Sequence, residues 1–528
     1  MAFEQRDRDI LGRTGRITVK GKTVETPVFL PVVNPLIDTI PPRRLEEEFR
    51  CQALITNSYI VWKHMDRGNP PDIHALLDFH GVVMTDSGAY QILVYGGVEV
   101  SQREIIEWQK AINSDIAVIL DIPTGWGVDR GKVEATVEET LRRAREAVPL
   151  IRDSDALWVG PIQGGVYLDL VARSAREVGE MPYHIHALGS PTQVMERYNY
   201  PVLVDMAMTA KINAPRSRPL HLFGAGHPNI LALSVAMGYD IFDSASYALF
   251  AKDDRYMTPR TTLQLGSLEH LPCTCPVCSK TDPQSLRELP KGERQRKLAE
   301  HNLHVILGEM RTIKQAIHEG SLWELVEQRS RGHPQLTSAL KTLAKYRDHL
   351  EEGAPGFKGR GIFIYDHLSL ARPEVTRFRR RLRQRVRLGS PTRVVFSSPT
   401  ERPYTEASEF KEISAEEALE GVDVVFVDAP LGAVPMPLAY TYPATQHMIS
   451  TPLDHETIVE AVEAASQYLA ETPATTLVLH WNTPLDQALL TKLGEPPNLD
   501  LNQHTPQEAA AWIKAHKQIR YNNRELKE

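Results

Sequence analysis

Three cysteines stand close together in the stretch CTCPVC, at Cys273, Cys275 and Cys278. The spacing C-x-C-x2-C lets three thiolates share one tetrahedral zinc ion, with a fourth ligand supplied by a histidine on a following helix. His301 and His304 are the next histidines along the chain. Three cysteines and one histidine close the coordination sphere. A closed sphere is typical of structural zinc, because catalytic zinc keeps one position open.

Redox chemistry is the alternative for these cysteines. Cys275 and Cys278 also form a C-x2-C pair, which thioredoxin-like enzymes use for disulfide exchange. The segments around them lack the βαβ pattern of that fold. The remaining cysteine, Cys51, is expected to be a buried thiol. Four cysteines in 528 residues do not make a disulfide framework, so metal binding is favoured.

Two aspartates, Asp86 and Asp243, each follow an apolar run, in TDSGAYQ (85–91) and FDSASYALFAKDDRYMTP (242–259). Small residues after each aspartate let a ligand approach the backbone. Two carboxylates that face each other suit glycosidic-bond chemistry, in which one attacks the anomeric carbon and the other handles the proton. The residues alone do not show that these two face each other, and a carboxylate at a strand end also serves to cap the next helix.

Eight short apolar, β-branched runs recur through the first half of the chain. They cover residues 28–33, 53–59, 82–87, 117–122, 157–163, 183–188, 220–226 and 241–246. Helical segments such as QREIIEWQKAI and VEETLRRAREAV lie between them. This alternation predicts an α/β fold of the (β/α)8 TIM-barrel type. An open, doubly wound sheet is the alternative.

The barrel places the candidate chemistry at one rim, because active sites of this fold lie at the C-terminal ends of the strands. Polar residues stand at five of the predicted strand ends: Asn57, Asp86, Asp121, Gln163 and Asp243. Gly-containing turns follow two other strands, in ALGS (187–190) and GAGH (224–227). Three carboxylates around one rim predict a site rather than helix caps alone.

A second domain is expected after the Gly-rich segment EEGAPGFKGRG (351–361). Residues 1–357 are predicted to form the barrel with a zinc-binding subdomain at about 265–330 and helices through 300–331. Residues 358–528 are predicted to form a smaller α/β accessory domain. Its strands are expected at 393–398, 423–430 and 474–481, and its helices at 414–421 and 455–470.

The net charge of −7 argues against a protein dedicated to coating nucleic acid. Locally, residues 372–393 hold nine arginines and one acid, Glu374. From charge alone such a run is most often a solvated helix face, but it is also the composition of a phosphate-contacting patch. No apolar run approaches the length of a membrane helix, and the N-terminus lacks the apolar core of a signal peptide. A cytoplasmic protein with no membrane partner is expected.

The chain closely resembles the archaeal, archaeosine-type tRNA-guanine transglycosylases. The matching motifs run in order from GRTGRITVKGKTVETPVFLPVVNP through ITNSY, MTDSGAYQ, SDIAVILDIPT, PIQGG, HALGS, FGAGHP and FDSASYALFAKDDRYMT to CTCPVC and EHNL. The resemblance implies a TIM-barrel pentosyltransferase with a zinc subdomain. Such enzymes exchange a guanine of tRNA for a 7-deazaguanine base without breaking the backbone. The archaeal branch inserts the base preQ0 at position 15, in the D-arm.

The resemblance also implies the roles of two carboxylates. Asp243 matches the nucleophile, which attacks C1′ of the ribose and forms a covalent tRNA–enzyme intermediate. Asp86 matches the general acid/base. Retained configuration follows from the double displacement, and the two carboxyl groups are expected about 5 Å apart in the complex.

Base recognition is assigned by the same resemblance. Asp121 matches the aspartate that accepts hydrogen bonds from N1–H and the exocyclic amine of a guanine-like ring. Gln163 and the backbone around Gly189 and Ser190 match the groups at the other edge of the ring. Ring stacking is expected from apolar residues near SGAYQ (87–91). One structural zinc would be held by Cys273, Cys275, Cys278 and His301, with His304 as a neighbour on the same helix.

The expected partners are tRNA, guanine and preQ0, with a homodimer and a separate PUA-domain subunit as further expectations. The latter arises because members of the family usually continue into a C-terminal PUA domain, whereas this sequence stops at YNNRELKE. The arginine run 372–393 is expected to contact tRNA. Two alternatives are a non-catalytic tRNA-binding paralogue or partner subunit and a queuosine-type transglycosylase acting at the anticodon. A scaffold would have no chemical reason to keep the whole predicted site.

Overall fold

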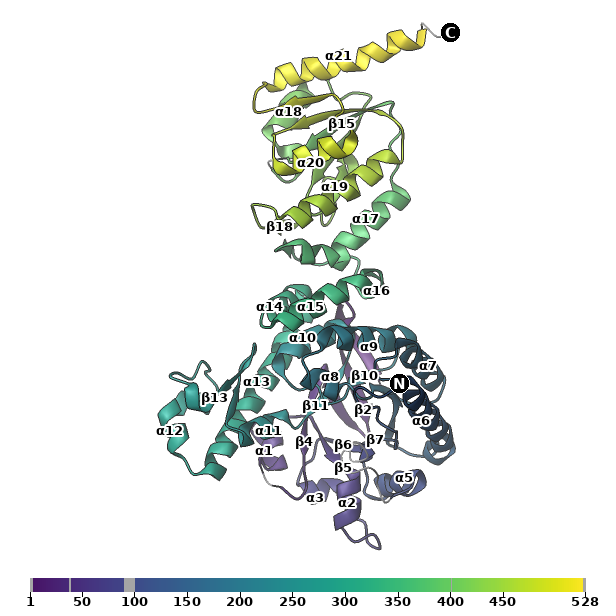
Figure 1. The fold of residues 1–528 in the computed structure, drawn as a ribbon, viewed down its shortest axis with the longest axis vertical. Helices are drawn as coiled ribbons and strands as arrows, with labels where there is room; N and C mark the ends of the chain where they lie inside the picture. The colour runs from purple at the N-terminus through teal and green to yellow at the C-terminus, as the bar shows by residue number, and fades with distance from the viewer. Residues whose placement is uncertain (1–2, 38, 90–99, 400, 526–528) are drawn as a thin grey trace. The chain divides into compact units, whose positions relative to one another are not determined.

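The computed structural model describes residues 3–37, 39–89, 100–399 and 401–525. The chain divides into two compact units, Met1–Pro355 and Gly356–Glu528, which Figure 1 colours from purple to yellow along the sequence. Tyr90 and Gln91, at the end of the motif expected to stack on the base, lie outside the described residues. In the described part of the chain, no helix has both the length and the apolar character needed to span a bilayer.

Eight parallel strands of the first unit close into a barrel in the order β10-β11-β4-β5-β6-β7-β8-β9. The strands are β4 (Val28–Val33), β5 (Ala53–Asn57), β6 (Val82–Asp86), β7 (Ile116–Val118), β8 (Leu157–Ile162), β9 (Ile185–Leu188), β10 (Leu220–Leu222) and β11 (Ile241–Ser244). Each begins within two residues of its predicted run. The predicted (β/α)8 barrel is therefore confirmed, and the open doubly wound sheet is wrong.

Helices surround the barrel (Figure 1). They are α1 (Pro42–Glu47), α2 (Ser58–His64), α3 (Ile73–Leu77), α5 (Gln102–Ala111), α6 (Arg130–Ile151), α7 (Leu168–Gly179), α8 (Thr192–Glu196), α9 (Tyr200–Asn213), α10 (Pro228–Ala236) and α11 (Ser246–Lys252). The longest of these, α6, buries Val133, Val137 and Leu141 at four-residue spacing against strand residues such as Trp158. This spacing keeps the apolar side chains on one face of the helix. Two of the helices, α8 and α11, also line a cavity at the rim of the barrel.

An antiparallel sheet, which the sequence analysis did not predict, precedes the barrel. It consists of β1 (Phe3–Asp9), β2 (Gly12–Val19) and β3 (Lys22–Thr26), in that order. Phe3, Ile17 and Val24 of this sheet belong to the same buried cluster as Ile55 and Met84 of the barrel strands. The sheet thus closes one end of the barrel core.

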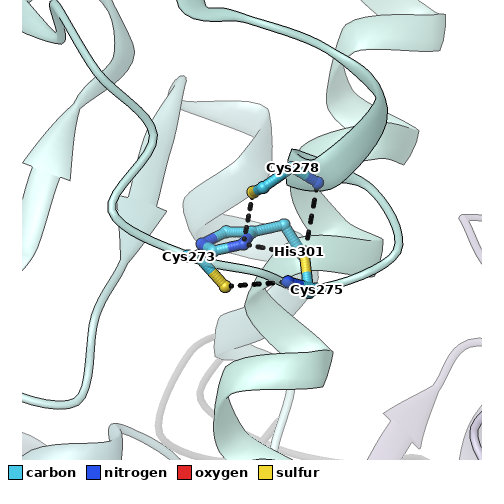
Figure 2. A group of neighbouring side chains, drawn as sticks. All are labelled: Cys273, Cys275, Cys278 and His301. Carbon is cyan, nitrogen blue, oxygen red and sulfur yellow. Dashed lines mark hydrogen bonds between the residues drawn. The ribbon is translucent and has the colours of Figure 1, made fainter.

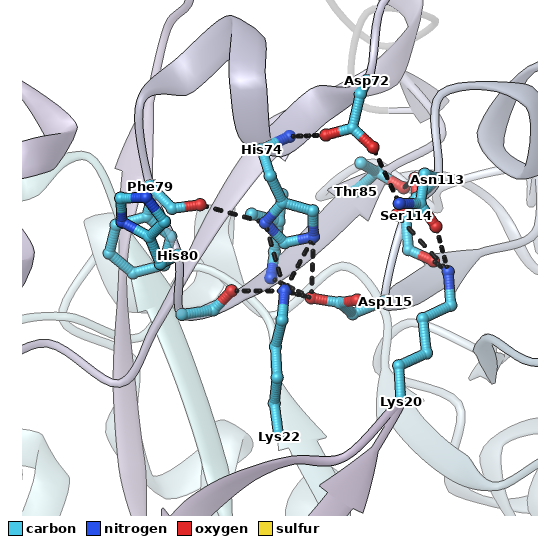
Figure 3. A network of polar contacts seen from close by, with 12 residues as sticks. Lys20, Lys22, Asp72, His74, Phe79, His80, Thr85, Asn113, Ser114 and Asp115 are labelled. Atoms are coloured by element: carbon cyan, nitrogen blue, oxygen red, sulfur yellow. Dashed lines mark hydrogen bonds and ion pairs between the residues drawn. The ribbon is translucent and has the colours of Figure 1, made fainter.

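Polar contacts tie the sheet to the end of the barrel where the strands begin (Figure 3). Asp115, directly before β7, pairs with Lys22 Nζ at 3.2 Å and His74 Nε2 at 3.1 Å, and also accepts from the Val83 amide. Burial opposes ionisation of Asp115, but the hydrogen bond from His74 and that amide hold its pKa below the ordinary range. Lys20 Nζ donates to Asn113 Oδ1 at 2.7 Å. The polar groups at the end of the barrel where the strands begin are therefore used to hold the fold together.

The expected zinc subdomain follows the last barrel helix. After the hairpin of β12 (Arg255–Met257) and β13 (Thr262–Gln264), which precedes the expected bounds of about 265–330, it contains α12 (Pro283–Glu288) and the long helix α13 (Lys291–Glu319). Figure 1 shows β13 and α12 beside the barrel, with α13 leading back to it. Three further helices complete the first unit: α14 (Leu322–Ser330), α15 (Pro334–Leu343) and α16 (Arg347–Gly353).

The second unit contains a five-stranded sheet in the order β17-β16-β15-β19-β20 and a separate parallel pair of strands, β14 and β18. The strands are β14 (Ile362–Ile364), β15 (Thr392–Ser397), β16 (Asp423–Asp428), β17 (Gly432–Pro435), β18 (His447–Ile449), β19 (Thr475–His480) and β20 (Asn498–Asp500). The helices are α17 (Pro373–Arg385), α18 (Ser408–Ala415), α19 (His455–Ala470), α20 (Pro484–Leu493) and α21 (Pro506–Glu525).

One helix of this unit was misplaced by sequence. The segment 414–421 contains good helix formers, but the helix is α18, and turns follow from 416 to 420. Phe410 and Ile413 anchor α18 in the core. The predicted segment offers only Ala418 for burial, and Glu417 adopts a positive φ of 55°. Tertiary packing, rather than intrinsic helix propensity, therefore determines where this helix forms.

Candidate active site

A cavity of about 1350 Å³ opens where the barrel strands end. The strand-end residues and glycine turns predicted from sequence all line it: Asn57, Asp86, Asp121, Gln163, Gly189, Ser190 and Asp243. They come from strands or strand ends of β5, β6, β7, β8, β9 and β11. The closed barrel brings these residues together although they are spread over nearly 190 positions of sequence.

Asp243 is held by one of its two oxygens. Its Oδ1 atom accepts hydrogen bonds from His221 Nε2 at 2.8 Å and from the Gly224 amide at 3.0 Å. Gly224 has a positive φ of 71°, a conformation that glycine adopts without strain. Oδ2 accepts no hydrogen bond from the described part of the chain, and Asp243 lines the cavity. Oδ2 is therefore the oxygen that can attack a bound ligand.

Asp86 ends β6 and lies beside Asn57 in the parallel register of β5 and β6. Its Oδ2 atom accepts from Asn57 Nδ2 and from the Gly88 amide, each at 3.2 Å. Burial, and then the negative charges of Asp121 and Asp243, raise the pKa of Asp86 from its ordinary 3.8 to about 7. A carboxyl group with this pKa can donate and accept a proton near neutral pH.

Asp121 and Gln163 form a buried pair. Gln163 Nε2 donates to Asp121 Oδ2 at 2.6 Å, while Gln163 Oε1 accepts from Ser190 Oγ at 3.0 Å and Thr124 Oγ1 at 3.2 Å. These contacts fix which end of the amide faces the carboxylate. Burial raises the pKa of Asp121 to about 6, against the effect of the Gln163 hydrogen bond. At pH 7 Asp121 is therefore mainly ionised and acts as an acceptor.

Gly189 allows Gln163 to lie across the backbone. A Cβ atom at position 189 would stand 2.1 Å from Gln163 Nε2, well inside any allowed contact. The next residue, Ser190, has a positive φ of 64°, which turns the chain so that its hydroxyl reaches Gln163. The backbone here is shaped to place the amide, and such unusual local conformations persist where the surrounding structure enforces them.

The mouth of the cavity is aromatic and basic, and the sequence pattern alone does not predict its aromatic part. Tyr198 and His333 stack with ring centroids 5.1 Å apart at 17°, and both line the cavity. Lys252, Arg255 and Arg260 line it as well. Aromatic rings and cations suit the bases and phosphates of a nucleic acid. Tyr198 and His333 are far apart in sequence, and no local motif joins them.

His221 was also missed. It lies inside the apolar run LHLFGAG, where a histidine passes for a core residue. Its ring is fully buried, and its other nitrogen, Nδ1, has no hydrogen-bond partner among the described residues. Because a carboxylate only accepts, Nε2 carries the hydrogen that Asp243 receives. A polar side chain on the strand next to that of Asp243 was the signal that could have found it.

The four predicted metal ligands lie together (Figure 2). The ligand atoms of Cys273, Cys275, Cys278 and His301 are all within 4.8 Å of one another. His301 Nδ1 is 3.3 Å from Cys278 Sγ and 3.5 Å from Cys275 Sγ. Tetrahedral zinc with bonds of about 2.0–2.3 Å sets its ligand atoms about 3.5–3.8 Å apart. The cluster therefore fits a single metal ion.

The surroundings of the cluster also fit a metal. His301 Nε2 lies 2.9 Å from the Met257 carbonyl, which leaves Nδ1 as the nitrogen that faces the thiols. The Tyr256 ring stacks on His301 at 3.7 Å. The amides of Cys275 and Cys278 point at the sulfur atoms of Cys273 and Cys275, at 3.4 and 3.5 Å. Such N–H contacts favour thiolates. His304 contacts Phe49 instead, at 4.5 Å between centroids.

Fold and site together define a barrel enzyme whose rim carries three carboxylates and an amide in one cavity. Residues 8–335 match the sequence model of the family described as queuine tRNA-ribosyltransferase, and the chain belongs to this family. It is accordingly a pentosyltransferase. The resemblance to the archaeal tRNA-guanine transglycosylases is confirmed by similar proteins, each named tRNA-guanine(15) transglycosylase.

Three of these relatives show how far the similarity extends. The Thermococcus kodakarensis protein is 48% identical over 392 residues, which are 74% of this chain and 67% of the relative. The Aeropyrum pernix protein is 49% identical over 383 residues, 71% of this chain and 74% of the relative. The Sulfolobus acidocaldarius protein is 39% identical over 476 residues, 89% of this chain and 93% of the relative.

Proposed function

We propose that this chain exchanges guanine at position 15 of tRNA for the 7-deazaguanine base preQ0. The convergence of Asp243, Asp86 and Asp121 in one cavity is the observation that carries the proposal. The names of the relatives support position 15. The cavity, at about 1350 Å³, has room for a nucleotide turned out of the folded tRNA, and enzymes that modify bases commonly bind their target in this way.

The first half of the reaction removes guanine. Oδ2 of Asp243 attacks C1′ of the ribose, and the C1′–N9 bond breaks with its electron pair leaving on the base. The protonated carboxyl of Asp86 gives its proton to the departing guanine. A covalent bond between Asp243 and C1′ then preserves the reactivity of the sugar, so no external energy source is required.

The second half inserts the new base. The Asp86 carboxylate takes the N9 proton of the incoming base, whose N9 lone pair attacks C1′ and releases Asp243. Two inversions at C1′ leave the original configuration, as in retaining glycosidases. A pKa of about 7 suits Asp86 to both proton transfers.

The buried pair of Asp121 and Gln163 selects the base. Asp121 accepts from N1–H and the exocyclic amine of a guanine-like ring, a pattern that guanine and preQ0 share. Gln163, the Gly189 backbone and Ser190 bind the other edge. Because Gln163 already holds Asp121 Oδ2 at 2.6 Å, the carboxylate is oriented before the base arrives. This reduces the ordering that binding must impose.

A single structural zinc would be held by Cys273, Cys275, Cys278 and His301. Bound there, zinc would cross-link the cysteine loop, residues 273–278, to α13, and the closed ligand set would leave no open position for a substrate. We assign residues 1–357 to catalysis, with the zinc subdomain included, and residues 358–528 to an accessory domain that binds tRNA.

A base-exchange assay tests the function and the site of modification together. Purified protein is incubated with labelled guanine and tRNA transcripts substituted either at position 15 or at the anticodon. We expect incorporation that depends on guanine at position 15, and chase of the label by preQ0. Asp243→Asn should abolish exchange and the trapped covalent complex while tRNA still binds. Undiminished turnover by this variant would reject Asp243 as the nucleophile.

The second candidate is exchange at the anticodon, favoured by the family description, which names queuine. It uses the same carboxylates and differs in tRNA position and incoming base. Incorporation that survives substitution at position 15 and is lost on substitution at the anticodon would establish this candidate and reject the first. Binding of tRNA without any exchange would establish the non-catalytic alternative.

A further inference from the structure

The arginine-rich segment 372–393 is not one uniform solvated face, because its arginines differ in burial and in partners. Arg372 and Arg393 are fully buried and serve the fold. Arg372 Nε bonds Glu374 at 2.8 Å. Arg393 donates to the carbonyl of Leu469 at 2.7 Å, at the end of α19. Buried guanidinium groups with such partners are not available to a ligand.

A second group lies along one side of α17 and just beyond it, at Arg379, Arg383 and Arg387. These arginines recur every four residues, which puts them on one face of a helix. Arg379 pairs with Glu460 at 2.5 Å, and both Arg383 and Arg387 pair with Glu471 at 2.6 Å. Acids on or next to α19 therefore neutralise this face.

A third group, Arg377, Arg381 and Arg385, follows the same four-residue interval on a different face of α17. All three line a second cavity, of about 220 Å³, together with Thr441 and Tyr442. Arg377 is buried, whereas Arg381 and Arg385 are exposed. Within the described residues, neither of the two exposed arginines has an acidic partner within 4.0 Å. We name Arg381 and Arg385 the open pair.

The acid in the wall of this cavity does not neutralise the open pair. Glu374 is almost fully buried and already forms ion pairs with Lys358 at 2.5 Å and Arg372 at 2.8 Å. These two cations, after the opposing effect of burial, hold the pKa of Glu374 well below its ordinary range. The cavity therefore presents positive charge to solvent.

The arrangement of these guanidinium groups selects the kind of anion. Residues four apart on a helix are separated by about 6 Å along its axis. Charges spaced in this way follow a chain of anions, whereas a site for one small anion needs groups that converge on a point. Guanidinium binds phosphate through two parallel hydrogen bonds and is the preferred partner of nucleic-acid phosphates. A polynucleotide backbone matches both features.

We propose that Arg381 and Arg385 bind the phosphate backbone of the tRNA, while Arg379, Arg383 and Arg387 hold α17 to α19. The inference rests on the proposed function in that both concern the same tRNA. It deepens that function by assigning the contact to two of the nine arginines in the segment and by excluding their paired neighbours.

The test compares two double variants of the full chain. Arg381→Gln/Arg385→Gln removes the open pair. Arg383→Gln/Arg387→Gln removes the same number of charges, at the same spacing, from the face of Arg379, Arg383 and Arg387, whose arginines pair with acids; we call it the paired face. Binding of a tRNA transcript is measured by electrophoretic mobility shift over a range of salt concentrations, and base exchange is measured in parallel. Circular dichroism checks that both variants fold.

We expect loss of the open pair to weaken tRNA binding about tenfold. The slope of log K against log salt concentration should become shallower by about 1 to 2, since each phosphate contact contributes close to one to that slope. KM for tRNA should rise with kcat unchanged. The paired-face variant should bind like wild type. Equal losses in the two variants would overturn the inference, as would competition by inorganic phosphate at matched ionic strength, which indicates a single-anion site.

The outcome separates this inference from the proposed function. Wild-type protein that binds tRNA through the open pair but catalyses no exchange would support the contact and reject the function. Wild-type protein that exchanges guanine while the open-pair variant keeps full tRNA affinity would support the function and reject the contact. Wild-type protein that binds no tRNA would reject both.

Discussion

His221 Nε2 lies 2.8 Å from Oδ1 of Asp243, on the strand that neighbours Asp243 in the barrel. The imidazole is fully buried, so no water competes for the contact. With Oδ1 held by His221 and by the Gly224 amide, the carboxylate is left with Oδ2 to present to the ribose in the proposed reaction. His221 is thus placed to orient the proposed nucleophile without touching the substrate.

Replacing His221 by phenylalanine keeps a ring but removes the donor. A hydrogen bond to a charged group contributes about 1.5–3 kcal/mol. We therefore expect kcat for base exchange to fall about 10- to 100-fold, with the KM for tRNA unchanged. His221→Gln, which restores an N–H donor, should recover part of the rate.

His186→Phe is the matched control, because His186 is equally buried, lies on β9 and is not among the described residues that line the cavity. It should keep the wild-type rate. A similar loss of kcat in both histidine variants would mean that the effect is general destabilisation rather than orientation of Asp243.

The raised pKa of Asp86 predicts the pH dependence of the first half-reaction. Burial and the neighbouring carboxylates bring this pKa to about 7, and the departing guanine needs the protonated form. Formation of the covalent tRNA complex should therefore be fastest below pH 7 and fall about tenfold per pH unit well above it. Single-turnover trapping across pH measures this. A rate that stays level through pH 8 would reject Asp86 as the proton donor.

The same carboxyl group should cost stability at neutral pH. The unfolded chain loses the Asp86 proton near the ordinary pKa of 3.8, whereas the folded protein keeps it until about pH 7. Stability due to this group therefore decreases as the pH rises between these values. Asp86→Asn should raise Tm relative to wild type at pH 8 and should raise it less at pH 4. An equal change in Tm at both pH values would contradict this sign.

The sequence placed the barrel strands well because each is buried on both faces and stands out as an apolar run, as in VFLPVV. The strand-end aspartates and Gln163 could be found since strands of a barrel end at a common rim. The sheet β1–β3 escaped prediction because β1, with the sequence FEQRDRD, buries only its two end residues. His221, Tyr198 and the sorting of the arginines depend on neighbours distant in sequence, which one chain's pattern does not reveal.

Gly189→Ala should damage base selection more than tRNA binding. The new Cβ would stand 2.1 Å from Gln163 Nε2, so the amide must leave its place beside Asp121. We expect the KM for free guanine and preQ0 to rise about tenfold or more, since an unpaired buried polar group costs about 1–3 kcal/mol. The affinity for tRNA phosphates should not change. Gly266→Ala, at a position with no atoms near the added methyl group, is the control.

Zinc removal should unfold the cysteine loop, residues 273–278, without directly disabling the cavity. The predicted ligands hold a loop against α13 through His301, and metal binding to such a site supplies folding free energy. We expect one zinc per chain by atomic absorption, and a lower Tm after chelation or in Cys278→Ser.

Cys51→Ser is the control, because Cys51 lies outside the cluster. It is a buried thiol, and burial raises its pKa to about 12. If Cys278→Ser kept its zinc and its Tm, the cluster would not be the metal site; if zinc were lost with Tm unchanged, the ion would not be structural.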